Sequence, residues 1–205
     1  MTITMELNQK SQADRTSAIR TIEAEIQAIN NLRDSVALEN LTQALDLMQN
    51  ATGRIIITGM GKSGHIGNKI AASLASTGTP SFFVHPAEAS HGDLGMITEN
   101  DVVIAISNSG ESRELVDIIN YCKRFDIKII SITKNAESSL GKAGTVVLEL
   151  PKQGEACPLG LAPTSSTTAT LYPLTVVSAS VELNVKNVFS VPVYTVPVFP
   201  AATIP

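Results

Sequence analysis

The sequence contains no tryptophan, only two cysteines and three histidines, and its charged fraction is 17%. Cys122 and Cys157 do not form a CxxC pair, which argues against a structural zinc site. We expect free thiols, because disulfides are rare in a reducing compartment. No histidine stands near Cys157 in the sequence to act as its base, so we predict a buried, inert thiol there rather than a nucleophile.

Basic clusters and long apolar runs are also missing. The formal net charge is −4, and no basic stripe is present to bind a nucleic-acid backbone. No run approaches the ~18–20 apolar residues that span a bilayer, and residues 1–10 lack the charged-then-apolar layout of a secretion signal. We therefore expect a cytoplasmic protein that binds neither nucleic acid nor membrane. Its 205 residues, 43% of them hydrophobic, are enough for one domain, with or without an appendage.

Two apolar stripes at helical spacing precede the first predicted strand. The first, which predicts a helix of about five turns, consists of Ile19, Ile22, Ile26, Ile29 and Leu32. The second consists of Leu38, Leu41, Leu45 and Met48. Helices in this position either cover the home sheet or pack across a partner subunit, and covering the home sheet is the simpler expectation.

Apolar runs and amphipathic stretches alternate from Arg54 onward. Strands are predicted at residues 54–58, 81–84, 102–106, 128–133 and 145–150. Helices are predicted at residues 66–76, 111–124 and, as a short segment, 138–142. Apolar strands separated by crossover helices indicate a parallel sheet covered on both faces. Ligands of such folds bind at the carboxyl ends of the strands, which here carry the loops 59–64, 85–95, 107–112 and 151–168.

The loop at residues 107–112, Ser-Asn-Ser-Gly-Glu-Ser, is the most informative of the four. It leads from an apolar strand to a predicted helix start, where unpaired N–H groups and a partial positive charge favour an anion. The hydroxyls of Ser107, Ser109 and Ser112 add neutral donors, so the loop suits a phosphate group. The alternative is that Ser109 or Ser112 only caps the helix.

Residues 59–64, Gly-Met-Gly-Lys-Ser-Gly, have the GxGxxG spacing of dinucleotide-binding loops. The next predicted strand is followed by His85, however, where such a site would use an acid to bind the ribose. A nucleotide P-loop does not fit either, because Ile56 occupies the place of its first glycine. We interpret the segment as a glycine-rich anion loop with Lys62 as its cation. The alternative is a tight turn with a solvated lysine.

The loop after the second predicted strand holds His85 and His91, together with Glu88 and Asp93. An imidazole among carboxylates can transfer protons near neutral pH, or bind a divalent metal such as zinc. The separation of the two histidines is not a standard zinc spacing, so we favour proton transfer or substrate hydrogen bonding. We expect His65, the third histidine, to be structural.

The last predicted loop carries Glu155 and then five consecutive hydroxyl residues at 164–168. Such a run before a helix suits anion binding. A helix entry rich in serine and threonine is also common for purely structural reasons, and the residues alone leave both interpretations open.

Five segments together resemble the sugar-isomerase (SIS) domain of arabinose 5-phosphate isomerases. They are residues 59–67, 75–80, 85–95, 107–112 and 157–168. The resemblance runs from about Ile19 to Leu171. It implies a three-layer α/β sandwich with a central parallel sheet flanked by helices, and two helices before the first strand. It divides the chain into a SIS domain at 1–171 and an atypical tail at 172–205, without a pair of CBS repeats.

The resemblance implies an aldose–ketose isomerase that interconverts D-ribulose 5-phosphate and D-arabinose 5-phosphate through an enediol. This reaction leads to 3-deoxy-D-manno-octulosonate and lipopolysaccharide. Members of that family are typically homotetramers that require no cofactor, and zinc inhibits some of them.

The resemblance also implies site residues. The catalytic positions are Lys62, Glu114 and Glu155, with Glu114 as the candidate base and Lys62 as the electrostatic stabiliser. His91 contacts the sugar, and His85 matches a zinc-sensitive position. The remaining substrate-binding positions are Gly78 and Thr79, which line the substrate, Ser63, and the phosphate ligands Ser107, Ser109, Ser112, Ser166 and Thr167.

After Leu171 the resemblance stops. The family continues with a helix and a His-Pro-Gly-Gly segment that supplies a further catalytic histidine, whereas residues 172–205 contain no histidine, no glycine and only two charged residues. Pro173 stands where the helix would begin, and the valine-rich remainder favours strand, so we predict that this helix does not form. Such an abrupt change looks like a shifted reading frame or an exotic terminus. The alternative function is therefore a catalytically impaired SIS protein that binds or senses a sugar phosphate.

Overall fold

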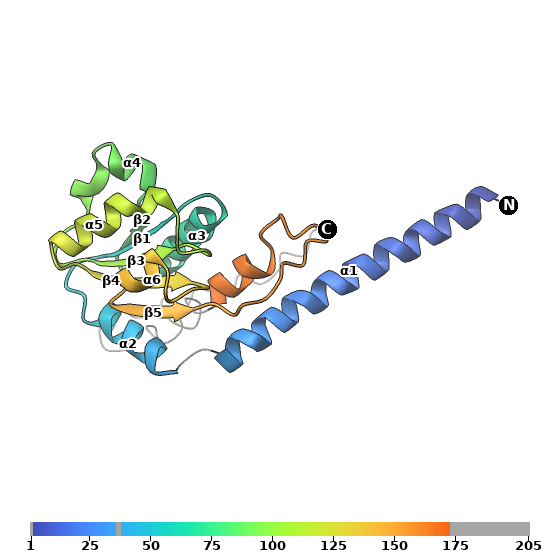
Figure 1. Cartoon of the computed structure of the whole chain (residues 1–205), viewed down its shortest axis with the longest axis horizontal. Coiled ribbons are helices and arrows are strands. Elements are labelled where there is room, and N and C mark those ends of the chain that lie inside the picture. The colour runs from blue at the N-terminus through green and yellow to red at the C-terminus, as the bar shows by residue number, and fades with distance from the viewer. Residues whose placement is uncertain (1, 36–37, 173–205) are drawn as a thin grey trace, which may run out of the picture.

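A computed structural model of the protein describes residues 2–35 and 38–172, and the side chains of residues 11–33 and 39–172. This part of the chain forms a five-stranded parallel sheet in the order β2-β1-β3-β4-β5. The strands are β1 (Ile55–Gly59), β2 (Ser81–Phe83), β3 (Val102–Ile106), β4 (Lys128–Thr133) and β5 (Val146–Glu149). Helices lie on both faces of the sheet (Figure 1), which confirms the predicted three-layer α/β fold.

The described helices are α1 (Thr2–Ser35), α2 (Leu38–Gln49), α3 (Lys62–Ser76), α4 (Pro86–Ser90), α5 (Val116–Arg124) and α6 (Ser139–Ala143), with 3-10 turns η1 (Asp93–Met96) and η2 (Arg113–Leu115). One more helix covers residues 165–172. The predicted helix at 111–124 thus begins later, with η2. The predicted loop at 85–95 contains α4 and η1, because Pro86 fixes a helical φ at a first helical position.

The sheet is buried on both faces because successive side chains of a strand point in opposite directions. In β1, Ile55 and Ile57 belong to the core under α2 and α3, whereas Ile56 belongs to the core under α4, α5 and α6. All five residues of β1 and of β3 are buried. This two-sided burial explains why these strands are apolar along their whole length.

The strand order creates a switch point between β1 and β3. These neighbours are in register, so that Gly59 is paired with Ile106 at their carboxyl ends. The chain leaves β1 toward α3 on one face of the sheet, and it leaves β3 toward α5 on the other face. The two loops therefore diverge from adjacent strand ends, and such a crevice is where ligands bind in doubly wound folds.

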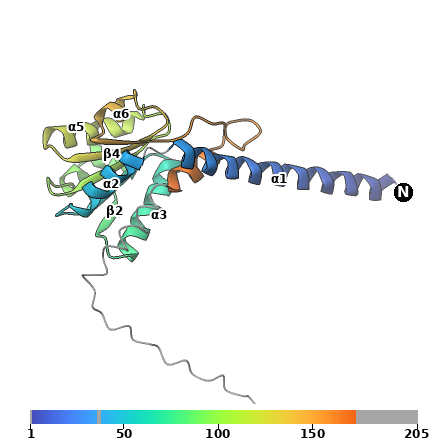
Figure 2. The same ribbon diagram turned by 90° about the horizontal axis from the view of Figure 1, so that it is seen from below.

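The two helices before β1 behave differently. In α2, Ala44 and Met48 are buried against the sheet, and Asn40 Nδ2 donates to the Val147 carbonyl of β5 at 2.9 Å. By contrast, α1 runs out from the body of the molecule in both views (Figures 1 and 2). The prediction that these helices cover the sheet of their own chain is therefore confirmed for α2 and wrong for most of α1.

The apolar stripe of α1 is largely uncovered because most of the helix does not pack on the domain. The helix has 34 residues, and only its carboxyl-terminal part reaches the domain, where Ala28 and Leu32 are buried. The stripe residues farther out are exposed, with relative exposures of 45% for Ile19, 59% for Ile22 and 53% for Ile26.

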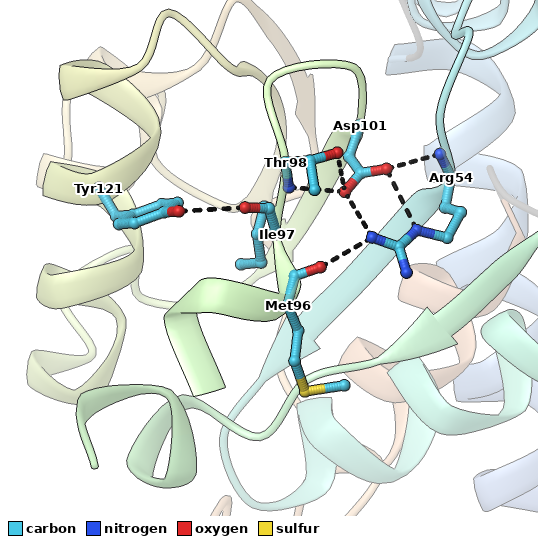
Figure 3. A network of polar contacts seen from close by, with 6 residues as sticks. All are labelled: Arg54, Met96, Ile97, Thr98, Asp101 and Tyr121. Carbon is cyan, nitrogen blue, oxygen red and sulfur yellow. Dashed lines mark hydrogen bonds and ion pairs between the residues drawn. The ribbon is translucent and has the colours of Figure 1, made fainter. Parts of the chain in front are cut away.

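The amino edge of the sheet is tied by Asp101 (Figure 3). Its side chain is fully buried and accepts hydrogen bonds from the Arg54 backbone N–H at 2.7 Å and from the Arg54 guanidinium at 3.2 and 3.3 Å. The backbone N–H and hydroxyl of Thr98 donate to the same carboxylate at 2.7 and 3.0 Å. Arg54 stands just before β1 and Asp101 just before β3, so this network joins the starts of the two strands at the switch point.

No helix within the described ranges 2–35 and 38–172 is long and apolar enough to cross a membrane. Tyr172 lies in the helix 165–172. The rest of the predicted atypical tail, 173–205, lies outside the described residues, and its lack of a helix stays a prediction.

Candidate functional site

The serine loop, residues 107–112, has a network of its own at the carboxyl end of β3. The Gly110 N–H donates to Ser107 Oγ at 3.1 Å, and the Glu111 N–H donates to Ser109 Oγ at 3.2 Å. The hydroxyls of Ser107 and Ser112 are hydrogen-bonded to each other at 2.8 Å. Because Ser107 and Ser109 accept these N–H groups through an oxygen lone pair, their hydroxyl protons remain for donation, apart from the one shared between Ser107 and Ser112.

The capping alternative for these serines does not describe the structure. Ser112 does precede η2, but its side chain makes no capping hydrogen bond. Ser109 Oγ accepts from Glu111, which precedes η2 and α5. The serine side chains are thus hydrogen-bonded within the loop, and none of their hydroxyls caps the helix.

The loop between β1 and α3 places a second set of donors beside the serine loop. Gly61 has φ 60° and ψ −126°, a backbone conformation that favours glycine. It precedes α3, a helix of 15 residues whose start has no side-chain cap. The exposed Lys62 and the half-buried Ser63 are the first two residues of α3. The uncapped N–H groups, the partial positive charge of the helix and the Lys62 ammonium give this helix start a chemistry that suits an anion.

The histidines flank α4, and Glu114 lies in the neighbouring turn. His85 precedes α4 and packs edge-on to Phe83, with ring centroids 6.3 Å apart. His91 follows α4. Because α4 packs against η2, which contains Glu114, the loop after β2 and the loop after β3 are brought together. His85, His91 and Glu114 are all exposed, so each is accessible to a substrate.

A metal centre has no support in the described part of the chain, where no group of three or more histidine, cysteine, aspartate or glutamate side chains is arranged to hold a metal ion. His85 is accessible to zinc as a single ligand.

Glu155 organises the start of the helix 165–172. Its Oε2 accepts from the Thr164 N–H at 2.7 Å, the Thr164 hydroxyl at 3.1 Å and the Ser166 N–H at 3.2 Å. Burial would raise the pKa of Glu155, but the hydrogen bonds from Ser166 and Thr164 outweigh it, so this pKa lies below its ordinary value. Glu155 is therefore ionised at neutral pH and held in one position.

The run of hydroxyl residues at 164–168 forms the beginning of this helix rather than a segment before it. Ser166 is buried, and its carbonyl accepts from the Thr170 hydroxyl at 2.7 Å. Thr167 Oγ1 donates to the Thr164 carbonyl at 2.6 Å. The purely structural interpretation thus accounts for part of the run, including the Thr167 hydroxyl. Ser166 lies in the first turn of the helix, at the start that Glu155 caps.

Gly78 and Thr79 are not brought to this edge of the sheet. They precede β2, and the next residue, Pro80, accepts at its carbonyl from the Ile55 N–H at 2.9 Å, at the amino end of β1. With β1 five residues long, they lie roughly 15 Å from the carboxyl edge at about 3.3 Å per residue. One chain therefore does not assemble all the predicted substrate positions.

The prediction of a buried, inert thiol at Cys157 is wrong. This cysteine is partly exposed, and backbone N–H groups of Ala162, Leu159 and Leu161 hold the pKa of its thiol below the ordinary value. The loop after Cys157 folds back over the sulfur, and the sequence has no signal for that. Cys122, in contrast, is buried, and this burial raises the pKa of its thiol to about 12. Both are free thiols, as predicted.

Two polar residues were missed by the sequence reasoning. Asn108 Oδ1 and Gln153 Nε2 are buried, and neither has a hydrogen-bond partner in the part of the chain that the structure describes. Both belong to carboxyl-edge loops, and Lys134 lies between them: its N–H donates to the Asn108 carbonyl and its Nζ to the Gln153 carbonyl, each at 3.1 Å. An acceptor and a donor without partners suit a hydroxyl-rich ligand.

Comparisons with known proteins show which family the chain is similar to. The SIS domain family matches residues 47–179. An arabinose 5-phosphate isomerase KdsD of Pseudomonas aeruginosa is 56% identical over 155 residues, which is 76% of this chain and 47% of that protein. The Francisella tularensis protein of the same name is 52% identical over 170 residues, 82% of this chain and 51% of that protein.

A solved Escherichia coli structure in complex with arabinose 5-phosphate is 39% identical and superposes with a TM-score of 0.79, covering 84% of this chain and 92% of that one. The chain spans about half the length of the curated relatives that it matches.

Proposed function

Because the chain belongs to the SIS domain family, we propose that it is an isomerase that interconverts D-arabinose 5-phosphate and D-ribulose 5-phosphate. The observation that carries the proposal is the serine loop beside the uncapped start of α3, at the switch point between β1 and β3. The isomerases named among its relatives and the ligand of the solved Escherichia coli structure support the sugar phosphate as substrate.

The phosphate would bind where neutral and cationic donors converge. The hydroxyls of the serine loop and of Ser63 surround its oxygens, and the α3 dipole offsets part of its charge, which leaves Lys62 for the reacting end of the sugar. Ser166 and Thr167 complete the set from the helix 165–172. The unpartnered Asn108 Oδ1 and Gln153 Nε2 would bind hydroxyls of the sugar.

The reaction needs a proton transfer between adjacent carbons. A base removes the proton from C2 of the aldose, and the carbonyl oxygen O1 gains negative charge and is protonated to give the enediol. The O2 hydroxyl then loses its proton as the ketone forms at C2, and the base returns a proton to C1. We assign the base to Glu114, which is exposed beside α4, and the stabilisation of the oxygen to Lys62. Glu155 serves as a second, fixed carboxylate, and His91 contacts the sugar.

The site would be completed by further copies of the chain in a homotetramer. Gly78 and Thr79 lie at the opposite edge of their own sheet, so they reach a substrate only in a neighbouring subunit. The exposed stripe of Ile19, Ile22 and Ile26 on α1 supports association, because an uncovered apolar face of this kind is costly in water. We further propose that this activity is cytoplasmic and supplies 3-deoxy-D-manno-octulosonate for lipopolysaccharide.

A coupled assay for ribulose 5-phosphate formation from arabinose 5-phosphate, together with calorimetric titration of arabinose 5-phosphate, tests the proposal. Turnover with binding is the expected result. Binding without turnover would favour a sugar-phosphate sensor instead, and the lack of both would refute a role in sugar-phosphate chemistry.

A further inference from the structure

Glu111 connects the serine loop to the first turn of α6. Its two carboxylate oxygens accept from the Ser139 N–H at 2.9 Å and from the Ser139 hydroxyl at 2.7 Å. Ser139 is the first residue of α6. Two residues that are 28 positions apart in the chain are thereby joined by a two-point contact across neighbouring loops.

The backbone continues this contact on the amino-terminal side of Glu111. The Gly110 carbonyl accepts from the Leu140 N–H at 3.0 Å, and the Asn108 carbonyl accepts from the Lys134 N–H at 3.1 Å. Gly110 itself, with φ 74°, lies so close to the α6 start that a Cβ atom there would collide with Ser138 Oγ. The serine loop therefore rests along the connection between β4 and α6.

Glu111 also fixes the hydroxyls that the proposed function assigns to phosphate. Its own N–H donates to Ser109 Oγ, and it stands between Ser109 and Ser112 in the loop. A rotation of the Glu111 backbone would break the hydrogen bond that places Ser109 Oγ. Holding the Glu111 side chain at Ser139 opposes that rotation.

We infer that Glu111 is a positioning residue, which sets the affinity for the phosphate group by fixing the serine loop to α6 through Ser139. This inference rests on the proposed function, since it requires the serine loop to bind a phosphate. Glu111 itself does not contact the phosphate: a carboxylate beside an anion would repel it. The N–H of Ser139 lowers the pKa of Glu111, followed by its hydroxyl, so both contacts are present at neutral pH.

The experiment measures the dissociation constant for arabinose 5-phosphate by calorimetry, with inorganic phosphate as a second probe, for Glu111→Ala, Ser139→Ala and the double variant. We expect Glu111→Ala to raise the dissociation constant and the KM about tenfold. The kcat should stay within about twofold, because the substitution weakens phosphate binding equally in the substrate complex and in the transition state. The double variant should be little weaker than Glu111→Ala, since Ser139→Ala removes only the hydroxyl hydrogen bond of a contact that Glu111→Ala has already removed.

Glu137→Ala is the matched control. Glu137 is another exposed carboxylate beside α6, and its Oε2 faces Lys142 at 3.5 Å and not the serine loop. It should bind like the parent. Thermal unfolding of every variant separates a loss of positioning from a loss of folded protein.

Three results would overturn the inference: parent-like affinity in Glu111→Ala, equal weakening in Glu137→Ala, or additive effects of Glu111→Ala and Ser139→Ala. An affinity loss that only follows the folded fraction would also overturn it. If the parent protein itself binds neither arabinose 5-phosphate nor inorganic phosphate, the proposed function fails, and the inference fails with it.

Discussion

Replacing Asp101 by asparagine should destabilise the protein strongly. The substitution Asp101→Asn would keep the size of the side chain but replace one acceptor oxygen by an NH2 group, which would face donors of Arg54 or Thr98. Breaking a buried ion pair costs about 3–5 kcal/mol. Because the Arg54 side chain is 40% exposed and water can solvate it, we expect about 2–3 kcal/mol at pH 7.

The assay is urea unfolding of parent and variant, read as the free energy of unfolding at pH 7. Asp126→Asn provides the control, because the Asp126 side chain is 92% exposed and pairs with Lys128 at 2.9 Å on the surface. Such a pair contributes about 0–1 kcal/mol. A difference below about 1 kcal/mol for Asp101→Asn, or one equal to that of the control, would refute the role of this network.

The contribution of Asp101 to the free energy of unfolding depends on pH with a definite sign. Burial would raise the pKa of Asp101, but the hydrogen bonds from Arg54 and Thr98 outweigh it, and this pKa lies below the ordinary value of 3.8. A group with a lowered pKa in the folded state stabilises the protein above its unfolded pKa, and this contribution is lost as the pH falls through the folded pKa. The difference between parent and variant should therefore be full at pH 7 and shrink below about pH 4.

Three further variants test the site and the proposed association. Ser109→Ala should weaken binding of arabinose 5-phosphate by about 1–2 kcal/mol in calorimetry, as expected for one hydrogen bond to a charged group; unchanged affinity with an intact circular dichroism spectrum would contradict a phosphate role. Glu114→Gln should lower turnover by about 10²-fold or more while binding survives, and parent-like turnover would transfer the role of base to Glu155 or His91. Ile22→Asp should lower the assembly mass in light scattering, because a charge is costly to bury in an interface; an unchanged mass would exclude α1 from it.

The strands were the most predictable part of the fold. β3 and β4 have the predicted bounds, and in β3 the apolar run, which is buried on both faces, ends directly before Ser107, the first polar residue of the loop. Helix starts were less predictable. The helix after the serine loop begins with η2, since Ser112 has an extended backbone with φ −67° and ψ 115°, and no local signal distinguishes that from a helical first turn.

Contacts between loops could not be read from the sequence. The prediction that the four loops lie at the carboxyl edge of the sheet needs only the rule that parallel strands align their carboxyl ends. The contacts of Glu111 with Ser139 and of Glu155 with Thr164 depend on side-chain directions across two loops. The exposed stripe of α1 was missed for a related reason, because periodicity identifies an apolar face but not the surface that covers it.

The two edges of the sheet differ in how their polar groups are paired, and this difference separates stability from binding. At the amino edge, the buried Asp101 carboxylate has its donors in Arg54 and Thr98, so a substitution there removes existing contacts. At the carboxyl edge, Asn108 Oδ1 and Gln153 Nε2 have no partner among the described residues, and the start of α3 has no side-chain cap. Unpaired groups of this kind cost stability and are retained where a ligand pairs them. Asp101→Asn should therefore lower the free energy of unfolding and have little effect on the affinity of the remaining folded protein for arabinose 5-phosphate. Ser109→Ala should lower that affinity and have little effect on the free energy of unfolding.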